Sequence, residues 1–105
     1  MNVASAGEPR AWRVVSSPSV PALEVSLLDR TYVLPWNQFL YAEGGDDQVH
    51  LVFATHDVLI RGRGLNLLMT DAAAQRLAGL AEAPRAERFG STAVACVREL
   101  SVQKV

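Results

Sequence analysis

A change of hydrophobic period within residues 48–82 constrains the fold of this chain more than any other feature of the sequence. Apolar residues recur at every second position from 49 to 53 and again from 58 to 60, with a polar break at 55–57. A period of two is typical of strands with one buried face. From Leu65 onward the period lengthens to about 3.6, the period of a helix. This stretch therefore predicts a hairpin followed by a helix that covers one face of a sheet.

The predicted helix runs from residue 65 to about residue 83. Its apolar stripe consists of Leu65, Leu68, Met69, Ala72, Ala73 and Leu80. Two glycines precede it and Pro84 follows it, as expected for a helix start and stop. Arg76 falls near the middle of the stripe, where an unpaired charge would be costly. Either Arg76 reaches solvent past a short alanine-rich contact, or the helix is broken near Thr70-Asp71; we expect one helix with a local irregularity.

Five further segments have the composition of strands. They are residues 11–15, 22–28, 31–34, 39–42 and 92–102. Asp29-Arg30 is short enough to join two strands in a hairpin, and Pro35 must end a strand or lie at an edge or bulge. Connections this short cannot hold a parallel crossover, so we expect the strands between residues 22 and 61 to form an antiparallel meander. The C-terminal strand is expected to return to the sheet, with the N-terminal strand as its candidate neighbour.

These elements predict the α+β fold class. The chain has 105 residues, half of them hydrophobic, which is enough for one domain with its own core. We expect a curved antiparallel sheet or partly open small β-barrel of about six to seven strands, with one helix before the last strand. Residues 1–9 are expected to be a disordered tail and residues 10–105 the single domain. The predicted core includes Leu51, Phe53, Ile60, Leu68 and Leu80.

Composition argues against several classes of protein. The net charge of −1 disfavours nucleic-acid binding, which depends on Lys and Arg contacts to phosphates. No apolar run approaches the roughly 20 residues of a membrane span, and the N-terminus lacks the apolar region of a signal peptide, so we expect a cytoplasmic protein. Cys96 has no internal partner for a disulfide and is expected to be a buried structural thiol.

Two sets of residues are candidates for a binding or catalytic site. His50 and His56 share the hairpin with Asp57, so a metal-dependent enzyme is one hypothesis, although their spacing matches no recognised ligand motif and half-exposed strand histidines are common. The second set is Arg61-Gly62-Arg63-Gly64, which precedes a helix start and could bind an anion. It lacks the Walker lysine and hydroxyl, so a tight strand-to-helix turn is the alternative.

The sequence favours a non-enzymatic protein without cofactors. No nucleophile motif is present, and Lys104, the one lysine, lies near the C-terminus. Residues 1–60 carry three bases against seven acids, a net charge of −4, whereas residues 61–105 carry seven bases against four acids, a net charge of +3. Opposite charges and open sheet edges suggest a binding or assembly module that acts as a homo-oligomer, a dimer or larger. Its partner is expected to be a second copy, or else another protein, and not nucleic acid or a membrane.

Overall fold

The computed structural model describes residues 12–15, 20–82 and 96–105. In these ranges the chain forms strands, one α-helix and one short 3-10 helix. Their bounds are β1 (Arg13–Val14), β2 (Ala22–Ser26), β3 (Thr31–Pro35), η2 (Trp36–Gln38), β4 (Phe39–Gly44), β5 (Gln48–Phe53), β6 (His56–Arg63), α1 (Leu65–Ala73), β7 (Leu77–Ala81) and β8 (Cys96–Lys104). No helix within these residues is long and apolar enough to cross a membrane.

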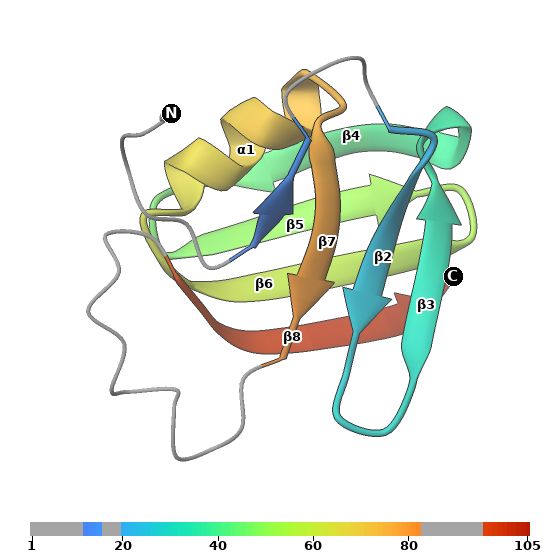
Figure 1. Ribbon diagram of the computed structural model, residues 1–105. Helices are drawn as coiled ribbons and strands as arrows, with labels where there is room; N and C mark the ends of the chain where they lie inside the picture. Colours follow the sequence, from blue (N-terminus) through green and yellow to red (C-terminus); the bar gives the residue numbers. More distant parts are fainter. Residues whose placement is uncertain (1–11, 16–19, 83–95) are drawn as a thin grey trace.

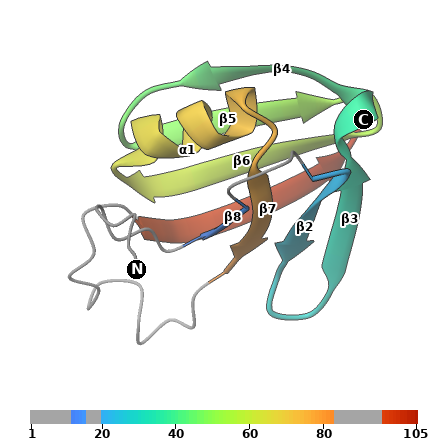
Figure 2. The same ribbon diagram turned by 45° about the horizontal axis from the view of Figure 1, so that its top comes forward.

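The strands form two four-stranded sheets packed as two layers. One sheet has the order β1-β7-β2-β3 and the other β4-β5-β6-β8. Figures 1 and 2 show that the strands of the two sheets cross at a large angle and that α1 lies in the layer of the first sheet, beside β7. This arrangement resembles the orthogonal class of sheet packing. The α+β prediction with mainly antiparallel sheet is confirmed, and the described part contains no closed barrel.

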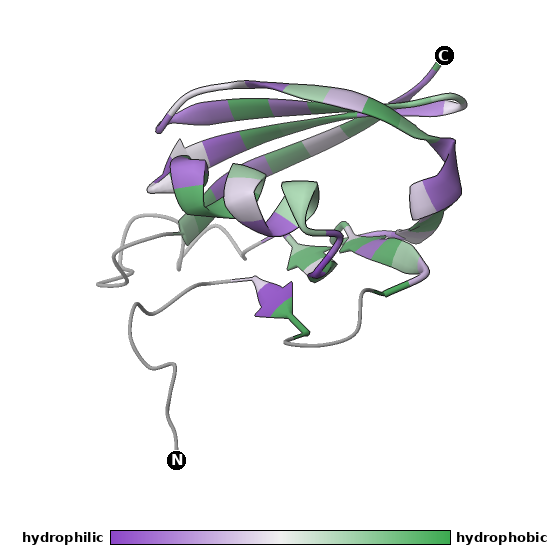
Figure 3. Cartoon of the chain, turned by 90° about the horizontal axis from the view of Figure 1, so that it is seen from above, coloured by the Kyte–Doolittle hydropathy of each residue, from purple (hydrophilic) through white to green (hydrophobic). Residues whose placement is uncertain are grey.

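The core lies between the two layers. Hydrophobic and hydrophilic residues alternate along the strands, as Figure 3 shows, so each sheet turns one face inward. In β5 the residues Val49, Leu51 and Phe53 are at most 1% exposed. All five predicted core residues are buried, which confirms the strand register inferred from their spacing. Cys96 is also buried, as expected.

The predicted meander is interrupted at Pro35, where the chain leaves one sheet for the other. The β2–β3 and β4–β5–β6 hairpins are antiparallel, as predicted, but β3 does not pair with β4. Pro35 has no N–H to donate, and η2 then turns the chain. Trp36 fills this corner: its indole N–H donates to the Leu77 carbonyl at 3.2 Å, and its ring lies 5.1 Å from that of Phe39. The corner therefore divides one expected sheet into two.

The predicted helix is wrong in its second half, because α1 ends at Ala73. The Gln75 N–H donates to the Ala72 carbonyl and the Arg76 N–H to the Asp71 carbonyl, which is the hydrogen-bond pattern of a Schellman motif. The residue at the centre of that motif must be left-handed, and Gln75 has a φ of 56°. Glycine normally occupies this position, so its absence removed the usual signal for a helix end.

Leu77 to Ala81 form a strand where a helix was expected. Residues 77–80 are all buried, and the strand pairs antiparallel with β1 on one side and parallel with β2 on the other. A short continuous apolar run fits a strand buried on both faces as well as it fits a helix. Arg76 lies in the exposed turn before β7, so the predicted conflict between its charge and the core does not arise. The parallel pair was not expected.

The C-terminal strand occupies a different place from the one expected. It pairs antiparallel with β6 through eight aligned residue pairs, whereas the N-terminal strand pairs with β7 in the other sheet. A bulge between Arg61 and Gly62 bends this pairing, and a Cβ atom at Gly62 would collide with the Cys96 carbonyl. The predicted tail, the stop at Pro84 and the start of the last strand at residue 92 lie outside the described residues.

The positive φ of Gln75 at the end of α1 leads to a testable prediction. Replacing it with glycine should raise the free energy of unfolding by about 0.5–1 kcal/mol, because glycine adopts positive φ without the steric cost of a Cβ atom. The matched control is Ala74→Gly: Ala74 has a φ of −85°, so this change should lower stability by a similar amount. Urea unfolding of both variants measures the difference, and a loss of stability in both would contradict the left-handed assignment.

The inward face of β5 leads to a second testable prediction. Phe53→Ala should destabilise the protein by about 3–5 kcal/mol, since it deletes a ring that is 1% exposed and packs against Trp36 and Phe39. Val52→Ala is the control, because Val52 is the neighbouring residue on the opposite, half-buried face of β5. Chemical denaturation should show a much smaller loss for Val52→Ala; the reverse order would mean that the register is shifted by one residue.

Candidate functional site

The two histidines are placed on opposite faces of the β4-β5-β6-β8 sheet. His50 lies on the outer face, where its Nε2 is 3.6 Å from Asp57 Oδ2. His56 directly precedes Asp57 in β6, so it points to the inner side, and its ring centroid is 5.4 Å from that of Tyr32. His56 Nδ1 also lies 2.9 Å from Thr55 Oγ1. The structure therefore does not bring together the pair proposed as metal ligands.

No other cluster of metal-binding side chains replaces this pair within the described ranges. Among those residues no group of three or more His, Cys, Asp or Glu side chains lies close enough to hold an ion. His50 and Asp57 form a diagonal cross-strand pair with about one third of each side chain exposed. As two partly exposed groups on the outer face of the sheet, this pair encloses no substrate.

The Arg61–Gly64 segment forms the strand-to-helix turn rather than an open cradle. Arg61 lies on the outer face of β6, 3.9 Å from Glu99 on β8. Gly62 permits the close approach of β8, and Gly64 has a φ of 70° at the N-cap of α1. Arg63 is half-buried beside its β8 neighbour Cys96. Both glycines are thus explained by backbone geometry.

An acidic residue of the chain itself occupies the start of α1. Asp46, in the loop between β4 and β5, accepts hydrogen bonds from the Gly64 N–H through Oδ2 at 3.3 Å and from the Leu65 N–H through its carbonyl at 2.9 Å. Its Oδ1 lies 3.5 Å from Asn66 Nδ2. The carboxylate thus takes the Gly64 N–H and the backbone carbonyl takes the Leu65 N–H, two of the groups that an anion would otherwise bind. An external anion would therefore have to compete with Asp46.

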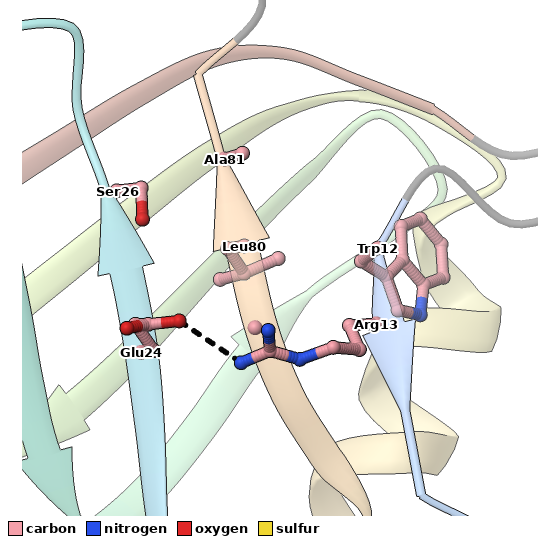
Figure 4. Close-up of a pocket in the computed structure, with 7 residues that line it drawn as sticks. Trp12, Arg13, Glu24, Ser26, Leu80 and Ala81 are labelled. Atoms are coloured by element: carbon pink, nitrogen blue, oxygen red, sulfur yellow. Dashed lines mark hydrogen bonds and ion pairs between the residues drawn. The ribbon is translucent and has the colours of Figure 1, made fainter.

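A shallow hollow of about 420 Å³ lies over β1, β7 and β2 (Figure 4). Its floor consists of small residues, including Ser26, Gly79 and Ala81. The Arg13 guanidinium crosses Gly79 and bonds to Glu24 Oε1 at 3.0 Å and to the Ala78 carbonyl at 3.2 Å. This ion pair is about half exposed, so it contributes little stability, and its charges neutralise each other. The hollow presents no buried polar group aimed at a ligand.

The edge of β4 is the surface with the clearest unused binding capacity. β4 is the terminal strand of its sheet, so one side of its backbone has no strand partner among residues 12–15, 20–82 and 96–105. Leu40 and Tyr41 are adjacent on this strand and are 62% and 51% exposed. A bulge places both residues opposite Val52, so both side chains lie on the outer face. We call Leu40, Tyr41, Ala42, Glu43 and Gly44 the β4 edge.

The other sheet edges are better protected. β1 has two residues and carries Arg13, β3 ends in Pro35, and the last residues of β8 include Lys104. Short length, proline and lysine are the devices by which edge strands avoid pairing. Val33 on β3 is 64% exposed but has no large apolar neighbour that is equally exposed on its strand. Within the described part of the chain, the β4 edge thus combines an open backbone with two neighbouring exposed apolar side chains.

The sequence predicts the strand at residues 39–42 but not its role as an open edge. In the structure Trp36 is buried and Phe39 is half-buried, whereas Tyr41 faces solvent. A signal was present in Leu40-Tyr41, because two successive large apolar residues break the alternation of a strand and can mark a bulge.

No protein-family model, no curated protein and no solved structure matches this chain.

The capping role of Asp46 can be tested directly. Asp46→Ala should lower the free energy of unfolding by about 0.5–1.5 kcal/mol, the range for one hydrogen bond, because the backbone carbonyl of residue 46 still accepts from the Leu65 N–H. Glu43→Ala is the control, since Glu43 is an exposed acid of the preceding strand. Thermal melts in millimolar phosphate should leave the wild-type midpoint unchanged, because Asp46 already fills the helix start. A saturable rise in that midpoint would support the anion-binding hypothesis instead.

Proposed function

We propose that this protein is a non-enzymatic assembly module that works as a homo-oligomer, with the β4 edge as its contact. The observation that carries the proposal is the pair of adjacent, more than half-exposed apolar residues, Leu40 and Tyr41, on a strand whose outer side meets no other strand in the described part of the chain. An exposed edge of this kind is a template for pairing with another chain. Pairing buries its apolar side chains and satisfies its backbone groups together.

The geometry of the remaining candidates favours this function over the two alternatives. A metal-dependent enzyme through His50 and His56 would need both side chains on one face, and they lie on opposite faces. Anion binding at Arg61–Gly64 would compete with the Asp46 carboxylate. The β4 edge needs no rearrangement to bind an extended strand.

The expected association is weak to moderate in affinity. The β4 edge has five residues, so pairing through it buries less surface than the roughly 1,200–2,000 Å² of a standard stable interface. We therefore expect dimers to form at micromolar or higher concentration rather than an obligate complex. The contact is mainly apolar and backbone-mediated, since Glu43 is its one charged residue. Added sodium chloride should weaken it little, because screening acts on exposed charges.

The proposal predicts the effect of removing the two apolar side chains. Light scattering at several concentrations up to about 100 µM should show wild-type protein above the monomer mass of 11.4 kDa. The double variant Leu40→Ser, Tyr41→Ser should remain monomeric at the same concentrations, because it retains the backbone edge but loses the apolar contact.

The matched control is the double variant Leu28→Ser, Val33→Ser. Leu28, in the β2–β3 turn, and Val33, on β3, are each 64% exposed, so the same kind of apolar surface is removed from the β2–β3 hairpin. This variant should associate like the wild type. A wild-type protein that scatters as a monomer throughout would refute the assembly function. An equal loss of association in both double variants would mean that the contact is not specific to β4.

A further inference from the structure

We infer that two copies of this chain join through antiparallel pairing of β4 with β4, across a two-fold axis at Ala42, so that two four-stranded sheets become one continuous sheet. This inference rests on the assembly function proposed above and specifies its partner and register. It follows from three features of the β4 edge: which backbone groups are free, which side chains meet, and where the bulge lies.

The hairpin between β4 and β5 identifies the free backbone groups. The Gly45 N–H donates to the Gln48 carbonyl, which makes residues 45 and 48 a hydrogen-bonded pair. Such pairs alternate along an antiparallel ladder, so Glu43 and Tyr41 bond to β5 through the next pairs. The N–H and C=O groups of Ala42 and Gly44 therefore point to the open side. Two Ala42 residues facing each other across a two-fold axis can exchange both of their hydrogen bonds.

Side-chain contacts distinguish this register from its neighbours. A two-fold axis that pairs most of the β4 edge with itself must pass near Tyr41, Ala42 or Glu43. Residues directly opposite each other in such an antiparallel pair are in contact, so each axis brings different side chains together. An axis at Glu43 would place two carboxylates directly opposite each other, which is destabilising. An axis at Tyr41 would make every hydrogen-bonded pair depend on Leu40, the residue at the bulge. The axis at Ala42 avoids the like-charge contact and keeps its central pair clear of the bulge.

The same register makes the edge complementary to itself. Tyr41 of each copy lies opposite Glu43 of the other, so the phenol O–H can donate to a carboxylate in two equivalent places. Leu40 lies opposite Gly44 of the other copy, which has no side chain; the position of its missing Cβ atom is filled by the Gln48 carbonyl of its own chain. Tyr41 thus gains a hydrogen-bond partner from a copy of the same strand in each of two equivalent places, as an isologous interface requires.

A charge-swap cycle at positions 41 and 43 tests the register. Tyr41→Lys and Tyr41→Glu both remove the phenol ring. In the Tyr41→Lys dimer the new ammonium group faces Glu43 of the other copy and is attracted to it. In the Tyr41→Glu dimer the new carboxylate faces the same Glu43 and is repelled. Each contact occurs twice in the dimer. The dissociation constant of Tyr41→Glu, measured by sedimentation equilibrium at low salt, should therefore exceed that of Tyr41→Lys by about tenfold or more.

Reversing the charge at position 43 should reverse the order of the two dissociation constants. Adding Glu43→Lys to Tyr41→Glu should restore association to within about threefold of Tyr41→Lys, and adding it to Tyr41→Lys should abolish the attraction. Val33→Lys and Val33→Glu control for net charge, because Val33 is exposed on β3 in the other sheet. These two variants should dissociate equally. Thermal melts confirm that each variant is folded.

Two results would overturn the inference, and only one of them would also overturn the assembly function. Equal dissociation constants for Tyr41→Lys and Tyr41→Glu, with wild-type protein still associating, would reject the Ala42 register and leave the assembly function standing. Wild-type protein that is monomeric in the same sedimentation experiment would reject both. A restored dimer in the Tyr41→Glu, Glu43→Lys variant, set against monomeric Tyr41→Glu, supports the register.

Discussion

The pairing of β7 on both of its sides holds the first sheet together. β7 binds β1 antiparallel and β2 parallel, and its residues 77–80 are buried from both faces. Gly79 lets the Arg13 side chain cross the outer face, where a Cβ atom would lie 2.9 Å from its Nη2. Without β7, β1 would have no strand partner, and the β2–β3 hairpin would be a two-stranded unit, which is marginal in water. The position of β7 depends in turn on the left-handed turn at Gln75.

Two buried indoles hold the elements around this strand together. Trp36 donates to the Leu77 carbonyl of β7, and Trp12 donates at 2.8 Å to Asp71 Oδ2 on α1. Asp71 is 7% exposed, so this hydrogen bond offsets part of the cost of burying a carboxylate. The first contact ties the corner at η2 to the first sheet, and the second ties β1 to the helix. Both are long-range contacts between residues more than 40 positions apart.

The division into two sheets also creates the surface on which the proposed function depends. One closed meander would leave no free edge, whereas two open sheets leave β1, β3, β4 and β8 as terminal strands. Length, proline and lysine protect three of them, and the β4 edge remains apolar and open. The Trp36 corner, which separates β4 from β3, is therefore also the reason that β4 can pair with another chain.

The sequence alone determined the elements whose periods are unambiguous. The alternation in residues 48–60 specified the β5–β6 hairpin and its inward face, since a shift by one residue would have exposed Phe53. Tertiary structure decided the rest. Leu77 to Ala81 suit a helix as well as a buried strand, and only β1 and β2 on either side select the strand. Likewise, a one-residue bulge in β4 makes both Leu40 and Tyr41 face solvent. The register between β5 and β6 places His50 and His56 on opposite faces of their sheet. Local pattern fixes which residues alternate; long-range pairing fixes which face and which neighbour each one meets.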